Sequence, residues 1–162
     1  MAILTTIGRA TYQEAMSTQA IHLAWGAGDP SWAGSPPSED PAATALVDEL
    51  GRLEALEVAF VTPDVGGSIV TPSGNAYTAS VEPTRYLFMD FHFAFVDEPT
   101  ATIREVGVFA GTLREVGVSE SQKYLLPAEV ADPGSLLLVE NLTPEIIRSI
   151  GVRERFKYVL TL

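Results

Sequence analysis

The segment Thr102-Ile103-Arg104-Glu105-Val106-Gly107-Val108 returns ten residues later as Thr112-Leu113-Arg114-Glu115-Val116-Gly117-Val118. Apolar and polar residues alternate along both copies, a pattern that indicates β-strands. The dipeptide Ala110-Gly111 lies between the copies and suits a tight turn. The duplication therefore predicts two short antiparallel strands joined as a hairpin, and it indicates a β-rich fold.

We expect the charges of the duplication to bind one another across this hairpin. With Ala110-Gly111 at the turn, Glu105 has Arg114 as its diagonal neighbour on one face, and Glu115 has Arg104 on the other. Exposed ion pairs contribute only about 0–1 kcal/mol each, so their predicted role is to fix the register of the strands. These arginines and glutamates are therefore interpreted as structural.

The composition limits both the class of protein and its partners. The 162 residues are 46% hydrophobic and 19% charged, as in a folded globular chain, and they carry a net charge of −11. Because an acidic surface repels phosphate groups, we expect neither nucleic acid nor a membrane as a partner. The absence of cysteine excludes disulfides and thiol chemistry. The amino terminus shows no signal-peptide pattern, and no apolar run approaches the roughly 20 residues of a membrane span.

The remaining pattern predicts an α+β fold, mainly an antiparallel β-sandwich or partly open barrel with two or three short helices. We expect a single domain over residues 1–162, with a helix-strand-helix region over about 1–52 and a β-rich body over about 53–162. Helices are expected over the first fifteen or so residues, over 40–50, and at the turn that Thr143-Pro144-Glu145 opens. Besides the duplication, strands are expected over 20–25, 53–61, 68–71, 76–81, 85–96, 135–141 and 155–162.

The strand expected over 85–96 carries the candidate metal ligands. Its apolar face, with Leu87 and every second residue to Phe95, is predicted to be core, and its other face includes Asp90 and His92. These two side chains offer two ligands, but the sequence indicates no third one, and His22 lies seventy residues away along the chain. We therefore interpret His92 as a hydrogen-bonded strand residue and predict neither a metal nor another cofactor.

Patterns for catalysis are weak. Nucleophilic catalysis needs a base beside the nucleophile, and no G-x-S-x-G elbow is present. One alternative that stays open is a carbohydrate-binding β-sandwich with Trp25 and Trp32 beside Asp29. Another is a small hydrolase that uses carboxylates such as Asp90 or Glu105. We assign no catalytic, cofactor-binding or metal-binding residue, and we do not expect an enzyme.

Segments at both ends and in the middle of the chain resemble the amino-terminal domain of bacteriophage tail-collar fibre and related baseplate adaptor proteins. Residues 4–10 followed by 21–29 are similar to that family's opening helix and its strand ending in a Gly-x-Gly-Asp turn. Residues 43–50 are similar to a helix of the family. Glu105-Val106-Gly107-Val108-Phe109 is similar to its Glu-Ile-Gly-Leu-Phe type strand, and residues 155–162 are similar to its closing aromatic strand.

The resemblance implies a structural component of a phage tail or baseplate. It would attach tail fibres or other receptor-binding parts to the tail tip through symmetric self-association, as a homo-oligomer in contact with other tail or baseplate proteins and the tail fibre. Its location would be the virion tail or baseplate, after synthesis in the host cytoplasm. The 30–41 loop and the second copy of the duplication depart from the family's pattern. A fibre shaft usually follows the family's domain but does not follow Leu162, so we expect an adaptor or baseplate component and not a fibre.

Overall fold

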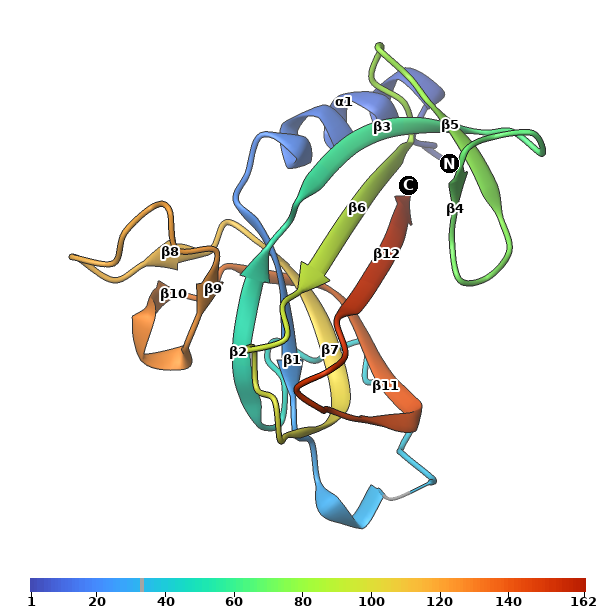
Figure 1. Ribbon diagram of the computed structural model, residues 1–162. Helices are drawn as coiled ribbons and strands as arrows, with labels where there is room; N and C mark the ends of the chain where they lie inside the picture. The colour runs from blue at the N-terminus through green and yellow to red at the C-terminus, as the bar shows by residue number, and fades with distance from the viewer. Residues whose placement is uncertain (33) are drawn as a thin grey trace. The chain divides into compact units, whose positions relative to one another are not determined.

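The computed structural model describes residues 1–32 and 34–162, which form two compact units. Unit 1 comprises Met1–Gln19, Ala55–Phe91 and Arg155–Leu162, and unit 2 comprises Ala20–Glu54 and His92–Glu154. Both consist mainly of antiparallel strands, as Figure 1 shows. The predicted β-rich α+β fold is confirmed, while the single domain expected over residues 1–162 stays a prediction.

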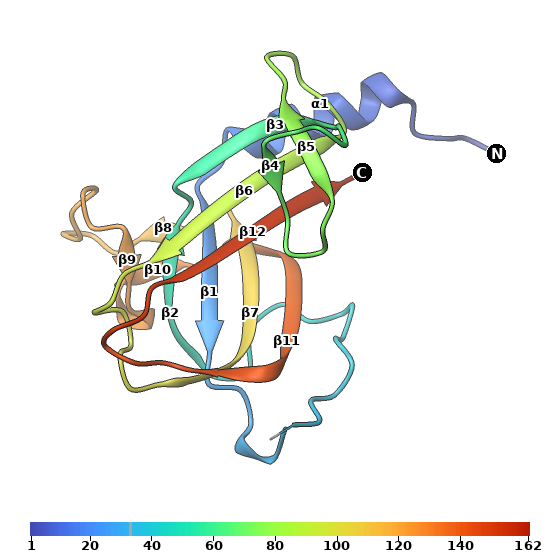
Figure 2. The ribbon, with the colours of Figure 1, turned by 45° about the vertical axis from the view of Figure 1, so that its right-hand side comes forward.

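Unit 1 combines one α-helix with a five-stranded sheet of order β12-β6-β3-β5-β4, which Figure 2 shows from a second side. The strands predicted before and after the Pro72–Asn75 turn form a hairpin in which Ile69 pairs with Tyr77, and the predicted closing strand is also confirmed. The elements of this unit are α1 (Thr6–Ser17), β3 (Glu57–Pro63), β4 (Ile69–Val70), β5 (Ala76–Ala79), β6 (Tyr86–Phe93) and β12 (Glu154–Thr161). The last two residues of β6 and the first residue of β12 belong to unit 2.

One buried side chain attaches helix α1 to the sheet of unit 1. Thr5 caps the helix by accepting a hydrogen bond from the backbone N–H of Gly8, which confirms the predicted amino-terminal helix. Gln13 is fully buried, and its Nε2 donates to the carbonyls of Arg85 at 3.1 Å and Leu160 at 2.9 Å. A single amide thus joins α1 to the ends of β6 and β12. No helix in the described part of the chain has the length and apolar character needed to cross a membrane.

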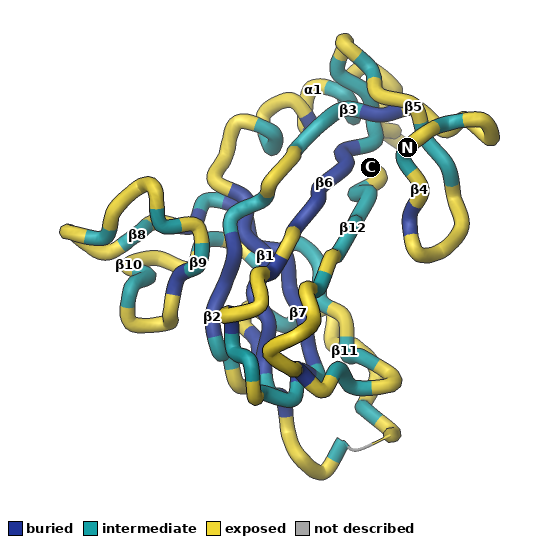
Figure 3. Tube along the Cα trace, in the orientation of Figure 1, coloured by how far each residue is buried: buried dark blue, intermediate teal, exposed yellow. Residues whose placement is uncertain are grey.

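Unit 2 is built on a five-stranded sheet of order β11-β7-β1-β2-β9, with β8 and β10 as a separate pair. Figure 3 shows that β1 and β7, at the centre of this sheet, are buried along most of their length. The elements are β1 (Ile21–Gly26), η1 (Pro30–Trp32), β2 (Glu49–Glu54), β7 (Thr102–Ala110), β8 (Leu113–Arg114), β9 (Tyr124–Leu125), η2 (Pro127–Glu129), β10 (Val130–Asp132) and β11 (Ser135–Ile147).

The hairpin predicted for the duplication is wrong. The first copy forms β7, but Leu23 of β1 pairs with Val108 on one edge of that strand, and Val139 of β11 pairs with Gly107 on the other. A strand has only two hydrogen-bonding edges, so none is left for the second copy. The second copy begins as β8, which pairs with β10 instead.

The predicted ion pairs between the two copies are wrong for the same reason. Arg104 pairs with Glu145 at 2.7 Å, and Arg114 pairs with Glu54 at 2.8 Å. Glu105 is buried and accepts hydrogen bonds from backbone N–H groups, while Glu115 is exposed. The two copies thus have similar sequences and different environments.

The helix predicted over 40–50 is also wrong. Asp40 does accept a hydrogen bond from the N–H of Ala42, but the turn does not continue into a helix. The carboxylate of Glu105 binds the N–H groups of Val47 at 3.0 Å and Asp48 at 2.8 Å, so these residues run extended into β2. Leu46 packs against Ala24 as part of a sheet core. These contacts outweigh the helical pattern.

The helical turn predicted at Thr143-Pro144-Glu145 lies inside β11, where Ile146 pairs with Ile103 after an irregularity in the ladder. The strand predicted over 53–61 is divided between β2 and β3. In the 85–96 strand, the predicted core face is confirmed from Leu87 to Phe93, but Phe95 is 38% exposed. Asp90, on the opposite face from the predicted core residues, is buried as well.

The duplication supplies a matched pair for testing the role of Glu105. Replacing buried Glu105 with Ala removes the charged acceptor of the Val47 and Asp48 N–H groups, so we expect the free energy of unfolding to fall by about 2–3 kcal/mol. The same change at exposed Glu115 should alter it by less than about 0.5 kcal/mol. Urea unfolding measures both. Equal losses in the two variants would contradict the assigned role of Glu105.

Candidate functional site

The tryptophans proposed as a sugar platform do not share an exposed surface. The ring of Trp25 is fully buried in unit 2, where it stacks on Phe93 with 3.6 Å between ring centroids. Its Nε1 donates to the hydroxyl of Tyr124 at 2.9 Å. Trp32 is half-buried and packs over Gly28, where a Cβ atom would meet its ring at 2.7 Å. Both tryptophans are therefore anchors, and Trp32 attaches the Pro-rich loop, of which residue 33 lies outside the described residues.

The acidic candidates are engaged in structural contacts. Asp29 accepts a hydrogen bond from the N–H of Ser31 within its own turn. Asp90 is 1% exposed, and its Oδ1 accepts from Nε of Arg155 at 2.9 Å while Oδ2 accepts from Nη2. Glu105 binds backbone N–H groups, as described above. Of the two carboxylates considered for a hydrolase, Asp90 thus forms an ion pair with Arg155, and Glu105 accepts hydrogen bonds from the N–H groups of Val47 and Asp48.

The histidines do not form a metal site with the acids. His92 is exposed, whereas His22 is 1% exposed on β1. Within residues 1–32 and 34–162, no three His, Asp or Glu side chains gather closely enough to bind one ion. Burial lowers the pKa of His22 to about 4, so this imidazole is neutral at physiological pH.

A buried arginine that the sequence analysis did not predict connects two loops of unit 2. The side chain of Arg148 is fully buried. Its Nη2 donates to the carbonyls of Ala94 at 2.9 Å and Asp97 at 3.2 Å, and its Nη1 donates to the carbonyl of Val152 at 2.9 Å. The guanidinium also lies 5.1 Å from the ring centroid of Trp25. Arg148 therefore fixes loops 94–97 and 148–154 to each other.

The same two loops, together with the last residue of β11, present apolar side chains to solvent. Val96, Ile147 and Ile150 are each about three-quarters exposed, and the ring of Phe95 lies 4.5 Å from the guanidinium of Arg153. We call this set the loop surface; its members are Phe95, Val96, Ile147, Ile150 and Val152. Several exposed apolar side chains on two cross-linked loops are typical of protein interaction sites.

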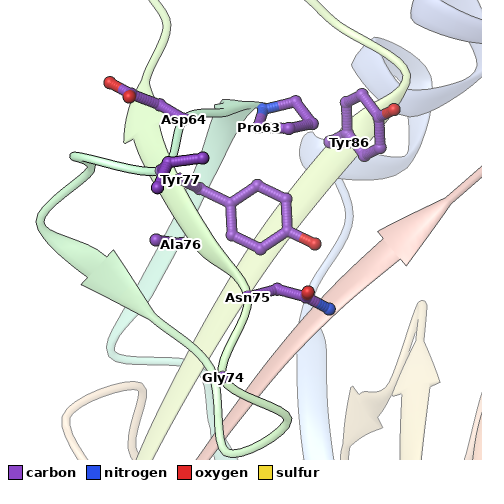
Figure 4. Close-up of a pocket in the computed structure, with 8 residues that line it drawn as sticks. Pro63, Asp64, Gly74, Asn75, Ala76, Tyr77 and Tyr86 are labelled. Atoms are coloured by element: carbon purple, nitrogen blue, oxygen red, sulfur yellow. The ribbon is translucent and has the colours of Figure 1, made fainter.

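A hollow in unit 1 forms a second surface feature, which Figure 4 shows. We call it the tyrosine pocket. It has a volume of about 480 Å³ and lies where β3, the β4–β5 hairpin and β6 meet. The rings of Tyr77 and Tyr86 are inclined at 53° with 6.2 Å between their centroids, and the side chain of Asn75 lies beside Tyr77. The pocket thus combines aromatic surface with an amide and one carboxylate, that of Asp64, which accepts hydrogen bonds from the Gly66 N–H and the Thr78 hydroxyl.

The whole chain, residues 1–162, matches the family described as baseplate wedge 3 tail fiber network component. The chain belongs to this family. It is also similar to virion protein 3 of Enterococcus phage phiEF24C, with 25% identity over 177 aligned residues that cover all of the chain and 96% of the relative. The resemblance to phage tail and baseplate proteins predicted from the sequence is confirmed.

This baseplate wedge protein is a structural component of a phage virion, located in the tail baseplate. Its sequence contained a signal for the loop surface. Val96 and Ile150 are apolar residues beside turn-forming Asp97 and Gly151, where polar residues are the usual choice. Arg148 offered no comparable signal, because nothing local distinguishes a buried arginine from an exposed one.

Acidic pH provides a test of the buried state of His22. The unfolded baseplate protein binds a proton at this residue below about pH 6.5, but the folded protein does so only near pH 4. The free energy of unfolding should therefore fall by about 3 kcal/mol from this group as pH drops through that window. In His22→Leu this component should be absent, as measured by urea unfolding from pH 7 to 4. Identical pH profiles for the two proteins would show that His22 is accessible to protons.

The role of Arg148 is tested by exchanging arginine for lysine. A lysine has no planar guanidinium and cannot donate to the carbonyls of both loops at once. Arg148→Lys should therefore lower the free energy of unfolding by roughly 2–3 kcal/mol. Amide hydrogen exchange should speed up in residues 94–97 and 148–153. Arg9→Lys, on helix α1 of unit 1, is the control and should change neither quantity. Unchanged exchange in Arg148→Lys would contradict the cross-link.

Proposed function

We propose that this baseplate protein attaches tail fibres, or other receptor-binding parts, to the tail tip through protein–protein contacts and has no enzymatic activity. The observation that carries the proposal is the loop surface, because a buried arginine holds its exposed apolar side chains in place. Holding side chains in one arrangement before binding lowers the entropy lost on association. The network named in the family description is a further argument for several contacts per subunit.

The distribution of charge supports a division of tasks between the two units. Sixteen of the twenty-one acidic side chains and six of the ten basic ones belong to unit 2, so unit 2 carries a net charge of −10 and unit 1 a net charge of −1. An acidic surface around an apolar site suppresses association between identical copies and favours a partner with basic residues. We therefore propose that unit 2 binds a different baseplate or fibre protein through the loop surface, and that self-association of the chain as a homo-oligomer uses other surfaces.

The proposal also treats the two units as one domain. If they unfold together, urea unfolding followed by fluorescence and by far-ultraviolet circular dichroism should give one coincident transition. Two separate transitions would assign an independent domain to each unit.

Particle assembly tests the loop surface. The double change Val96→Asp and Ile150→Asp places two charges on exposed positions, so the free energy of unfolding should change by less than about 1 kcal/mol. Incorporation into tails should fall at least tenfold, measured by quantitative mass spectrometry of particles made when the variant is the sole source of the protein. Val116→Asp, at a fully exposed valine of unit 2, is the matched control and should be incorporated normally. Normal incorporation of the double variant would contradict the proposal.

A further inference from the structure

Within residues 1–32 and 34–162, the sheet of unit 1 ends in two edges that pair with no further strand. Its strand order places β12 at one edge and β4 at the other. β12 is a regular strand of eight residues, while β4 has only two. In the described part of unit 2, by contrast, the edge strand β11 is partly covered, because Asn141 binds Glu39 through its N–H and the carbonyl of Pro37 through its side chain. An uncovered regular edge strand is a template for pairing with another chain.

Hydrogen bonds define the direction in which the backbone groups of β12 point. The N–H of Leu162 donates to the carbonyl of Arg85 beside β6. Antiparallel strands alternate their bonds from residue to residue. Lys157, Val159 and Thr161 therefore direct their N–H and C=O groups away from β6. Three donors and three acceptors lie along the outer edge of β12.

The outer edge of β4 faces the same space. The N–H of Thr71 donates to the carbonyl of Asn75 within the β4–β5 hairpin, so the backbone groups of Val70 point away from β5. The Nζ of Lys157 lies 3.5 Å from the carbonyl oxygen of Val70. A whole lysine side chain thus spans from β12 to β4, a distance greater than the roughly 4.8 Å between paired strands. Among the described residues, no ladder of backbone hydrogen bonds joins the two edges. We call the space between them the seam; Lys157, Val159 and Thr161 border it on β12, and Val70 borders it on β4.

The tyrosine pocket lies next to this seam. Its residues Asn75 and Tyr77 belong to the hairpin that carries β4, and Tyr86 begins β6, the neighbour of β12. Pro63 pairs with Tyr77, so both side chains lie on the same face of the sheet. The seam therefore has a row of backbone groups on one side and aromatic surface beside it.

We propose that the seam between β4 and β12 is a docking site for one extended peptide segment of another virion protein. The segment adds to the outer edge of β12, lays apolar side chains on Tyr77 and Tyr86, and presents a carboxylate to Lys157. Recognition of an extended segment by a sheet edge uses main-chain hydrogen bonds for affinity and pockets for side-chain specificity. The inference rests on the proposed function and names the kind of partner that unit 1 receives.

Charge specifies the occupant further. Residues 155–162 contain no acidic side chain, and residues 65–77 contain no charged side chain of either sign. Asp64, which lines the pocket, already accepts hydrogen bonds from the Gly66 N–H and the Thr78 hydroxyl. Arg155 is already paired with Asp90, whereas among the described residues the ammonium group of Lys157 reaches a carbonyl at the limit of hydrogen-bond distance and no carboxylate. A carboxylate is the complement that this ammonium group lacks. A sugar would use the tyrosines and Asn75 but would leave the backbone row of β12 unused, so the geometry favours a peptide.

The experiment measures amide hydrogen exchange of the full chain with synthetic peptides. The probes are eight-residue peptides of alternating Val and Thr with Glu at one of the eight positions, and matched peptides with Lys in place of Glu. At least one Glu peptide should slow exchange at least tenfold at Lys157, Val159 and Thr161, and leave the inward-facing Leu160 and Leu162 unchanged. The Lys peptides should bind at least tenfold more weakly. In Lys157→Glu the preference should reverse, and in the control Lys123→Glu it should not.

Three results would overturn the inference. One is that no Glu peptide slows exchange along β12 at millimolar concentration. Another is equal protection of inward-facing and outward-facing amides, which would indicate general stabilisation. A third is binding of mono- or disaccharides that is lost in Tyr77→Ala and leaves β12 exchange unaffected, which would assign the pocket to sugar. None of these results bears on particle incorporation through the loop surface, so failure here and failure of the proposed function are distinguishable.

Discussion

The two hydrogen-bonding edges of β7 constrain most of unit 2. Once β1 and β11 occupy them, the second copy of the duplicated segment has no strand to fold back on and pairs with β10 instead. The same central strand directs Glu105 toward the backbone of residues 47 and 48. That contact keeps the segment before β2 extended. The neighbours of β7 thus explain why the repeat forms no hairpin, why the two predicted ion pairs do not form, and why residues 43–50 are not helical.

Buried arginines join segments that strand pairing alone leaves apart. Arg52 is 2% exposed, binds Glu49 through two bonds of 2.8 Å, and donates to Thr112 and the carbonyl of Pro133. Arg148 links loops 94–97 and 148–154 through carbonyls. A guanidinium suits this task because its planar fork donates in several directions at once. Such links keep the loops in one arrangement, as the proposed docking of a partner requires.

Local sequence predicted the elements whose pattern agrees with their surroundings. Helix α1, β1, the β4–β5 hairpin, the apolar face of β6 and β12 all follow from alternation, capping or turn residues that nothing elsewhere in the chain opposes. The errors share a different cause. Residues 43–50 carry a helical stripe, yet Leu46 is buried against a sheet and Glu105 binds the adjacent N–H groups. Trp25 and Asp90 looked available for chemistry, and each is enclosed by residues distant in sequence.

The sequence by itself determined the class of this protein: β-rich, acidic, without cysteine, and similar at both ends and in the middle to phage tail and baseplate proteins. Alternation and composition are local properties, and a family likeness needs no coordinates. The tertiary structure alone decided which strands are neighbours, which charges pair and which apolar side chains stay in solvent. These depend on contacts between residues far apart in the chain, such as Arg148 with Ala94 or Lys157 with Val70, and no local pattern encodes them.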